Sequence, residues 1–236
     1  MYDDDYFEAD YFYTNQESIK TVHYNHFVEI ADIAKEHCTI GNKLLEIGPG
    51  KGTFLKMCID RGIHAEALEL SPNVAQKLTN QLGCNVYPGL LDESVFENET
   101  YAMVVAFDVI EHCTDPMQWL KNIYRILKPG GILALSTVNI YNFLYTLGHA
   151  LYKLQMSRAI EKLYPPYHLY YFTPVTLRKY MSETGFSIMK IQQENYDYRN
   201  ATSDFLEQLI LRIIYLLHNV TGNKTNQYII ASKPME

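Results

Sequence analysis

The sequence predicts an α/β fold in which a mostly parallel sheet carries helices on both of its faces. Two stretches support this prediction, KLLEIGPGKGTF (43–54) and AEALELS (65–71), because each contains a short apolar run of the kind that forms a buried parallel strand. The first run leads into a glycine-rich turn and a helix. The second lies about twenty residues further on, the distance typical of a strand–helix–strand unit.

The composition is that of a globular protein. The chain has 236 residues, of which 47% are hydrophobic and 20% charged, enough for one sizeable core. The formal net charge of -7 and the absence of a dense Lys/Arg cluster argue against a polyanionic partner, so we expect no nucleic-acid substrate.

The cysteines and the first ten residues bear on the cellular compartment and on whether the protein has a metal site. The cysteines lie far apart without metal-ligand or redox-pair spacing, which predicts free, mostly buried thiols and no metal site. No apolar run reaches the roughly 20 residues that span a bilayer, and the first ten residues are acidic, unlike a signal sequence. We therefore expect a cytoplasmic protein. The four cysteines are Cys38, Cys58, Cys84 and Cys113.

The glycine-rich turn predicts a pocket for a nucleotide-like cofactor. Glycine has no Cβ, so the backbone at Gly48 and Gly50 can approach a ligand closely, and the next helix offers unpaired N–H groups. Glu69, at the end of the second strand, can accept hydrogen bonds from both hydroxyls of a ribose. A dinucleotide fold needs its third glycine at position 53, where this chain has Thr53. This spacing counts against a nicotinamide-dependent oxidoreductase, which remains the contrasting alternative.

With the acidic Glu46 before it, the GxGxG pattern resembles motif I of class I S-adenosylmethionine-dependent methyltransferases. The resemblance implies a Rossmann-like, seven-stranded, mostly parallel sheet with an antiparallel last strand and helical lid insertions. It also implies that Glu46, Gly48 and Gly50 line the methionine part of the cofactor and that Glu69 holds the ribose. A structural turn in another doubly wound protein is the plainer alternative. The cofactor-binding residues expected in these two stretches are Glu46, Gly48, Pro49, Gly50, Gly52, Glu69 and Leu70.

A second diagnostic block runs over residues 101–139 and contains the segments FDVIEH and LKPGG. It predicts a strand, a helix that starts at Asp115-Pro116 and has a basic end at Arg125 to Lys128, and a further strand after the glycines. The block is similar to the fourth and fifth strands of the methyltransferase core. The resemblance implies that Phe107 and Asp108 end the fourth strand at the pocket, with Glu111 and His112 toward the sulfonium.

Some of these roles stay open. His112 is either catalytic or a structural hydrogen-bonding group that shapes its loop. In the family a polar residue after the third strand (84–87) contacts the adenine, but here Leu90 and Leu91 occupy that place and Asp92 comes late, so we expect Leu91 and Asp92 near the adenine with contacts through the backbone.

The chain before the first strand predicts an amphipathic helix. Thr14 and Glu17 have capping-box spacing, and apolar residues follow at helical spacing to about Glu36. In many small-molecule methyltransferases such a segment covers the cofactor, so residues 1–40 are expected to form an N-terminal helical cover. Packing on the sheet is an equally good interpretation for any one residue.

The expected core comprises residues 41–138 and 173–236, with a substrate-recognition insertion over 139–172. Within the insertion, apolar residues at helical spacing predict a helix or a pair of helices to about Leu163. The segment YPPYHLYYF (164–172) is similar to the PPxHLYxF segment of a methyltransferase branch found in surface-glycan and natural-product clusters. His168 in this segment is either the catalytic base or a buried structural histidine. Tyr167, Tyr170 and Tyr171 are candidates for an aromatic substrate wall, and His149 and Asp197 are weaker base candidates.

The end of the chain predicts three more elements after a helix between Thr173 and Gly185. Residues 186–195 and 226–232 predict the last two strands, the final one antiparallel. Residues 203–220 predict an amphipathic helix with an apolar half, on which His218 does not lie. The apolar half of this 205–220 helix is expected to contact the domain or a second copy in a homodimer, with peripheral membrane contact as the alternative.

The sequence therefore predicts an S-adenosylmethionine-dependent methyltransferase that releases S-adenosylhomocysteine. In-line displacement needs a held acceptor and, for a hydroxyl, a base. The expected acceptor is a hydroxyl, or else an amine, of a small-molecule, sugar or lipid-linked precursor. The alternative from another class is a cofactor-binding partner protein without catalysis.

Overall fold

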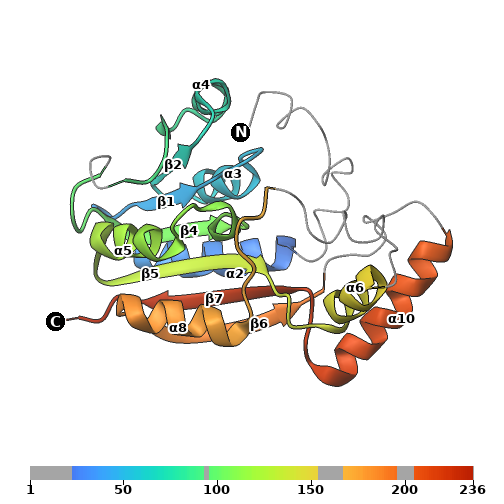
Figure 1. Ribbon diagram of the computed structural model, residues 1–236. Helices are drawn as coiled ribbons and strands as arrows, with labels where there is room; N and C mark the ends of the chain where they lie inside the picture. Colours follow the sequence, from blue (N-terminus) through green and yellow to red (C-terminus); the bar gives the residue numbers. More distant parts are fainter. Residues whose placement is uncertain (1–22, 93–95, 154–166, 196–204, 236) are drawn as a thin grey trace.

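The computed structural model describes residues 23–92, 96–153, 167–195 and 205–235, and these residues contain a seven-stranded mixed sheet (Figure 1). The strand order from edge to edge is β3-β2-β1-β4-β5-β7-β6. Strand β7 is antiparallel to both of its neighbours and the other pairs are parallel, as the sequence predicts. The strands are β1 (Leu44–Ile47), β2 (Ala65–Glu69), β3 (Val86–Pro88), β4 (Tyr101–Phe107), β5 (Leu127–Val138), β6 (Ser187–Glu194) and β7 (Asn226–Ser232).

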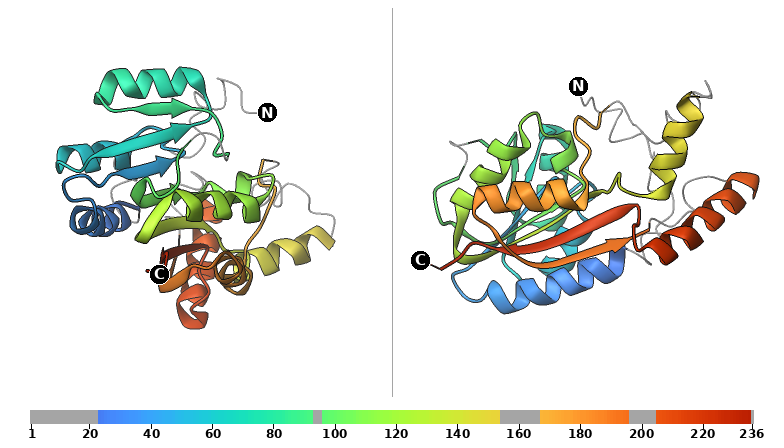
Figure 2. Two further views of the ribbon diagram at one scale, coloured as in Figure 1. Left: turned by 90° about the vertical axis from the view of Figure 1, so that its left-hand side faces the viewer. Right: turned by 60° about the horizontal axis from the view of Figure 1, so that its bottom comes forward.

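Helices cover both faces of the sheet (Figure 2). Successive residues of a strand point to opposite faces, so Leu44 packs with α2, α3 and α4 while Leu45 packs with α5 and α8. Both leucines are fully buried, as befits a central parallel strand. The described helices are α2 (His23–His37), α3 (Thr53–Asp60), α4 (Pro72–Leu82), α5 (Pro116–Ile126), α6 (Phe143–Lys153), α8 (Pro174–Thr184), α10 (Phe205–Thr221) and the short 3-10 helix η1 (Ile110–His112).

Three helices begin with a capping residue followed by proline, the start signal that the sequence predicts at Ser71-Pro72, Asp115-Pro116 and Thr173-Pro174. The side chains of Ser71, Asp115 and Thr173 each accept a hydrogen bond from the backbone N–H three residues later, and a proline follows each cap. Thr173 also forms a reciprocal capping box with Thr176. These local signals fix the starts of α4, α5 and α8 where the sequence places them.

The junction between α5 and β5 differs from the prediction. Helix α5 ends at Ile126, not at Lys128, and β5 begins at Leu127, before the two glycines. Leu127 pairs with Tyr101 of β4, and Gly130 N–H donates to the carbonyl of Lys233 after β7 (2.9 Å). The segment is extended because strands on both sides supply hydrogen-bond partners, which a helical continuation would leave unsatisfied.

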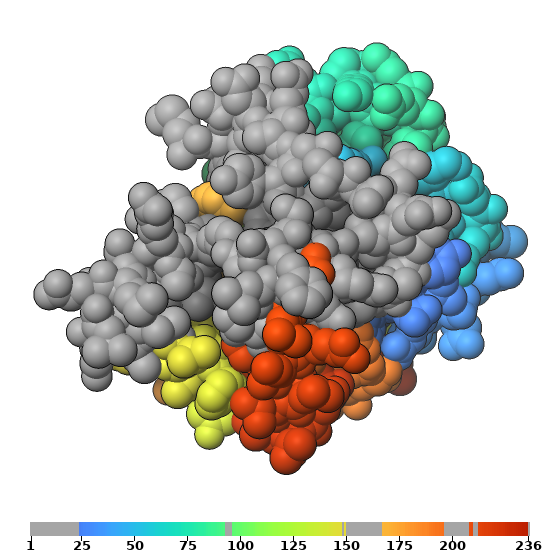
Figure 3. Space-filling view, turned by 90° about the vertical axis from the view of Figure 1, so that its right-hand side faces the viewer, coloured from blue at the N-terminus to red at the C-terminus, as the bar shows by residue number. Residues whose placement is uncertain are grey.

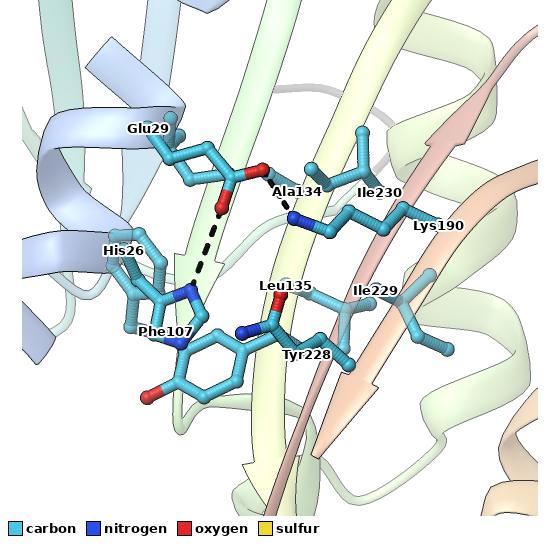
Figure 4. Close-up of a pocket in the computed structure, with 11 residues that line it drawn as sticks. His26, Glu29, Phe107, Ala134, Leu135, Lys190, Tyr228, Ile229 and Ile230 are labelled. Atoms are coloured by element: carbon cyan, nitrogen blue, oxygen red, sulfur yellow. Dashed lines mark hydrogen bonds and ion pairs between the residues drawn. The ribbon is translucent and has the colours of Figure 1, made fainter. Parts of the chain in front are cut away.

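Helix α2 packs on the sheet, and its residues line a narrow hollow together with residues of β6 and β7 (Figure 4). There Glu29 lies between His26 and Lys190, and the His26 ring stacks on Tyr228 with ring centroids 3.8 Å apart. His26 Nε2 also lies 2.8 Å from a carboxylate oxygen of Glu194. These polar groups pair with one another, so the hollow serves to anchor α2. Residues 1–22, which include the predicted capping box, lie outside the described ranges.

Helices α6 and α10 adjoin each other beyond one end of the sheet (Figures 1 and 3). His218 of α10 was expected on the polar half, but it is fully buried: its Nδ1 lies 2.8 Å from Asn195 Oδ1, and its Nε2 accepts a hydrogen bond from Leu144 N–H (3.4 Å). The exposed face instead carries apolar side chains such as Leu216 and Val220. None of the helices in the described ranges is long and apolar enough to cross a bilayer.

Candidate functional site

The glycine turn between β1 and α3 requires glycine at two positions. Gly48 has φ 69° and Gly52 has φ 73°, in the left-handed region that favours glycine. A Cβ on Gly48 would lie 2.8 Å from Val109 Cγ2, and one on Gly52 would lie 2.7 Å from Leu78 Cδ2. Gly52 N–H closes the turn by donating to the Pro49 carbonyl (2.8 Å). The turn therefore keeps its backbone open at the carboxyl end of β1.

A Cβ added at Gly50 would meet no atom within 4 Å, and four residues earlier Glu46 has a carboxylate oxygen without a hydrogen-bond partner among the described residues. Glu46 is almost fully buried, and its Oε2 has no hydrogen-bond partner among the described residues. Burial raises the pKa of this carboxyl to about 8, and the neighbouring Glu69 adds to the shift. A buried carboxylate oxygen without a partner fits a ligand that brings a donor or a positive charge, as the ammonium of a methionine moiety does.

Glu69 ends β2 with a carboxylate that is already oriented. Ser71 N–H donates to Glu69 Oε1 (3.0 Å), and burial raises the pKa of the carboxyl while backbone hydrogen bonds oppose that shift. Leu70 beside it is partly exposed and Leu91 is buried, whereas the Asp92 side chain is exposed and its carbonyl accepts from Arg125 (3.3 Å). The proposed ribose and adenine contacts at these residues stay predictions.

The end of β4 contains strained backbone at an acidic residue. Asp108 has φ 54°, in the left-handed region that a residue with a side chain rarely adopts. Ser136 of β5 holds it there, because Ser136 Oγ–H donates to Asp108 Oδ1 (2.9 Å) and Asp108 N–H donates to the Ser136 carbonyl (3.1 Å). Phe107 packs against Phe27 and Phe54. Asp108 is thus held at the edge of the sheet where β1, β2 and β4 end.

One turn further on, Glu111 is fully buried. Its Oε2 accepts from Thr137 Oγ1–H (2.9 Å), whereas its Oε1 has no hydrogen-bond partner among the described residues. Burial raises the pKa of Glu111 to about 8, with a further contribution from Asp108. The carboxyl is therefore fixed in orientation with one oxygen left for a ligand.

A loop far along the chain joins η1. The carbonyl of Glu111 accepts hydrogen bonds from the N–H groups of Leu169 (2.8 Å) and Tyr170 (3.0 Å). His112 Nδ1 lies 3.0 Å from the carbonyl of Tyr167. A carbonyl only accepts, so Nδ1 of His112 carries the proton and Nε2 carries the lone pair. The segment 167–170 is thereby attached to η1 by three backbone carbonyl contacts.

His168 completes this cluster. Its ring meets the His112 ring edge to face, with centroids 4.8 Å apart, and its buried Nδ1 has no hydrogen-bond partner among the described residues. Burial and the neighbouring His112 lower the pKa of His168 to about 4, and burial also lowers the pKa of His112. Both rings are neutral near pH 7 and can accept a proton or bind a cation.

The structure brings together most of the residues that the sequence singled out, and it adds three that were not predicted to belong to the site. Val109 limits the space at Gly48, Ser136 holds Asp108, and Thr137 orients Glu111. Ser136 and Thr137 lie inside β5, and the apolar run there predicts a buried strand but no functional role for its polar residues. Of the weaker base candidates, His149 is exposed on α6 and Asp197 lies outside the described residues.

Comparisons with known proteins point to methyltransferases. A family model described as a methyltransferase domain matches residues 23–191. The ubiquinone biosynthesis O-methyltransferase of Ruegeria pomeroyi is 32% identical over 113 residues, 46% of each chain. The enzyme of the same description from Rickettsia canadensis is 25% identical over 184 residues, 75% of this chain and 71% of its own. This chain spans about half the length of several curated relatives that it matches.

Among solved structures, the fold is similar to that of a SAM-dependent methyltransferase from Archaeoglobus fulgidus. The TM-score is 0.63 with 18% sequence identity, and the match covers 92% of this chain and 97% of the other. At this identity the likeness concerns the fold alone.

Proposed function

Since this chain belongs to the methyltransferase-domain family, we propose that it transfers a methyl group from S-adenosylmethionine to a hydroxyl of a small acceptor and leaves S-adenosylhomocysteine. When bound, S-adenosylmethionine supplies a methyl group on a sulfonium, which an acceptor displaces in line. The protein has to hold the cofactor, aim the acceptor, exclude water and remove the hydroxyl proton.

The glycine turn and the two buried glutamates are the parts suited to hold the cofactor. The backbone at Gly48 and Gly50 allows close approach, and Oε2 of Glu46, which has no partner in the described part of the chain, is suited to the ammonium of the methionine part. Glu69 ends the neighbouring parallel strand at the same edge, where its carboxylate can accept from ribose hydroxyls. Leu70, Leu91 and Asp92 remain candidates for the adenosine side.

One observation carries the acceptor side of the proposal: two neutral imidazoles and a buried carboxyl meet beyond the end of β4. His112 and His168 are both neutral near pH 7, because burial lowers their pKa values. A neutral imidazole can take the proton from an acceptor hydroxyl as its oxygen attacks the methyl carbon. His168, whose Nδ1 has no hydrogen-bond partner within the described ranges, is the candidate base, and His112 is its immediate neighbour.

The names of the relatives support a hydroxyl acceptor. They are described as ubiquinone biosynthesis and malonyl-[acyl-carrier protein] O-methyltransferases. Oxygen acceptors are therefore favoured over amines, and small-molecule, sugar and lipid-linked hydroxyl compounds form the panel to examine. The net charge of -7 speaks against nucleic acid as the acceptor.

The test is methyl transfer from S-adenosylmethionine that carries a deuterated methyl group to a panel of phenolic, sugar and lipid-linked alcohols, read by mass spectrometry. For an accepted compound, His168→Ala should lower kcat by about 100-fold or more and leave S-adenosylhomocysteine affinity unchanged. His64→Ala, which changes an exposed histidine outside the proposed site, is the matched control and should keep the wild-type rate. Cofactor binding without transfer to any member of the panel would favour a non-catalytic binding partner instead.

A further inference from the structure

We propose that Glu111, His112 and His168 bind a divalent transition-metal ion. Each residue offers one ligand atom, and the three atoms lie within 4.8 Å of one another. The set brings together two imidazole nitrogens and one carboxylate oxygen from two segments that are far apart in the sequence. Nothing in the spacing of these residues along the chain indicates a metal, and the sequence predicts none.

The hydrogen bonding of the Glu111 carboxyl is the first independent support for a metal site. An ordinary buried carboxyl has hydrogen bonds to both oxygens, because burying an unsatisfied one costs free energy. Glu111 is fully buried, yet only Oε2 has a partner, Thr137, and Oε1 lacks one among the described residues. Thr137 fixes the carboxylate in the way that supporting hydrogen bonds orient metal ligands. A cation at Oε1 would satisfy the remaining oxygen.

The tautomer of His112 is the second support. Metal-binding histidines usually donate the N–H of one ring nitrogen to a carboxylate or a backbone carbonyl, which directs the other nitrogen to the ion. His112 has this arrangement, because its Nδ1 donates to the Tyr167 carbonyl (3.0 Å). Its Nε2 is consequently the ligand nitrogen.

The third ligand is held by backbone contacts. His168 lies between Tyr167 and Leu169, and both of these bond to η1: the Tyr167 carbonyl to His112 and the Leu169 N–H to the Glu111 carbonyl. His168 Nδ1 is buried without a partner among the described residues. The three donors are therefore brought close before any ion arrives.

The donor set selects the class of metal. Mg²⁺ and Ca²⁺ prefer oxygen ligands, whereas imidazole favours Zn²⁺, Co²⁺, Fe²⁺ and similar ions. Two histidines with one glutamate match the composition of catalytic zinc sites, in which three protein ligands leave at least one position open. The negative charge of Asp108 acts on Glu111 and on both histidines and would further favour a cation.

For catalysis, which rests on the proposed methyl transfer, the open position would take the oxygen of the acceptor hydroxyl. His168 is then a metal ligand, so in the metal-bound protein the ion takes the place of His168 in promoting loss of the hydroxyl proton. A bound divalent ion makes such a hydroxyl more acidic, so its O–H bond breaks and the proton passes to water. The metal-bound oxygen then forms the new O–C bond as the C–S bond of the cofactor breaks, and the sulfur keeps the electron pair in neutral S-adenosylhomocysteine. No oxidation or reduction occurs.

The test is a titration of chelator-treated full-length protein with Co²⁺, followed by its visible absorption, with Zn²⁺ as competitor. We expect one Co²⁺ per chain and displacement by Zn²⁺. His112→Ala and His168→Ala should each weaken Co²⁺ binding by about 100-fold or more. Glu111→Gln should do the same while keeping an acceptor for Thr137. His64→Ala, which changes an exposed histidine, is the control and should bind as the wild type does.

Each variant is first shown to be folded by its affinity for S-adenosylhomocysteine and its thermal unfolding. The proposal is overturned if the wild type takes up no Co²⁺ at stoichiometric concentrations, or if the three cluster variants bind it as tightly as the control. Either result leaves the methyltransferase proposal intact, provided that S-adenosylhomocysteine still binds. Conversely, Co²⁺ binding that depends on the cluster supports the metal site even if no acceptor is methylated.

Discussion

His112 and Tyr167 are 55 residues apart in the chain, yet the Nδ1 of His112 lies 3.0 Å from the Tyr167 carbonyl oxygen. This contact sets the tautomer of His112 and holds the neighbouring His168 beside it. It also joins the turn after β4 to the loop before α8. The functional cluster therefore depends on backbone contacts of the 167–170 loop as much as on side chains.

Leu169→Pro should separate the loop from η1. Proline removes the N–H that donates to the Glu111 carbonyl (2.8 Å), whereas the Leu169 side chain is exposed. A small displacement of His168 should lower kcat/KM for methyl transfer by about 100-fold, with S-adenosylhomocysteine affinity unchanged in calorimetry. Leu169→Ala keeps the N–H and should retain wild-type kinetics. Equal losses in both variants would mean that the side chain, not the hydrogen bond, matters.

Gly48→Ala should weaken cofactor binding through the shape of the turn. The backbone of Gly48 has φ 69°, and an added Cβ would meet Val109 Cγ2 at 2.8 Å. We expect a stability loss of about 1–3 kcal/mol together with at least a tenfold loss of S-adenosylhomocysteine affinity. Gly222→Ala is a matched control, since Gly222 has φ 75° with nothing within 4 Å of its Cβ position. It should lose stability but keep affinity; a parallel loss of affinity would contradict the assignment of the turn.

Cofactor affinity should rise with pH between about pH 6 and about pH 8 because of Glu46. In the free protein burial raises the pKa of Glu46 to about 8, so the group is mostly protonated near neutral pH. The ammonium of the cofactor favours the carboxylate, so binding releases a proton, and a higher pH makes that release easier. Above the raised pKa the carboxylate is already formed and the dependence should end.

Calorimetry in two buffers of different ionisation enthalpy would count the released proton. Other groups that face Glu46 are Glu69, whose pKa is also raised, and the thiols of Cys58 and Cys84, which burial keeps neutral. Glu46→Gln should remove most of the proton release. Any proton that Glu111 releases, because its pKa is also raised, should still be released in this variant. Unchanged proton release in Glu46→Gln would show that another group titrates.

Glu66, on the opposite face of β2 from Glu69, should matter for stability alone. It accepts hydrogen bonds from Lys43 (2.7 Å), Asn85 (3.1 Å) and the buried Tyr101 hydroxyl (2.9 Å). Glu66→Gln should lower the free energy of unfolding by about 2 kcal/mol, measured by denaturant titration, without changing S-adenosylhomocysteine affinity. Glu97→Gln, an exposed change, should have no effect.

The lowered pKa of Glu66 determines how its contribution to stability depends on pH. Burial by itself raises the pKa of Glu66, but the hydrogen bonds from Lys43, Asn85 and Tyr101 outweigh it and lower the pKa below the ordinary value of 4.5. The stabilisation is therefore present above pH 4.5 and lost as the pH falls through the lower folded value. The difference between wild type and Glu66→Gln should shrink in that range. A difference that grows on acidification would contradict this network.

Much of the fold could be predicted because it rests on local patterns. Apolar runs mark buried strands such as β1, and caps followed by proline mark the starts of α4, α5 and α8. The start of β5 at Leu127 and the burial of His218 could not be predicted, because distant partners such as Lys233 and Asn195 decide them.

The candidate site also has one part that local patterns predict and one part that depends on distant contacts. The glycine turn, Glu46 and Glu69 lie in one strand–helix–strand unit and could be named from spacing. Glu111 and His168 were each named as candidates, but their meeting depends on hydrogen bonds between η1 and the 167–170 loop. The orientation of the Glu111 carboxyl depends on Thr137, which lies in no motif and bonds to Oε2, while Oε1 has no partner among the described residues. A metal site therefore could not be predicted from the sequence.

The most direct measurement is a calorimetric titration of the purified protein with S-adenosylhomocysteine, beside a Glu69→Ala variant and an NAD control. We predict binding at one site per chain, an affinity about 10- to 100-fold weaker in Glu69→Ala because a charged hydrogen-bond acceptor is lost, and no binding of NAD. Folded wild-type protein that binds NAD, or that binds S-adenosylhomocysteine equally well without Glu69, would contradict this prediction.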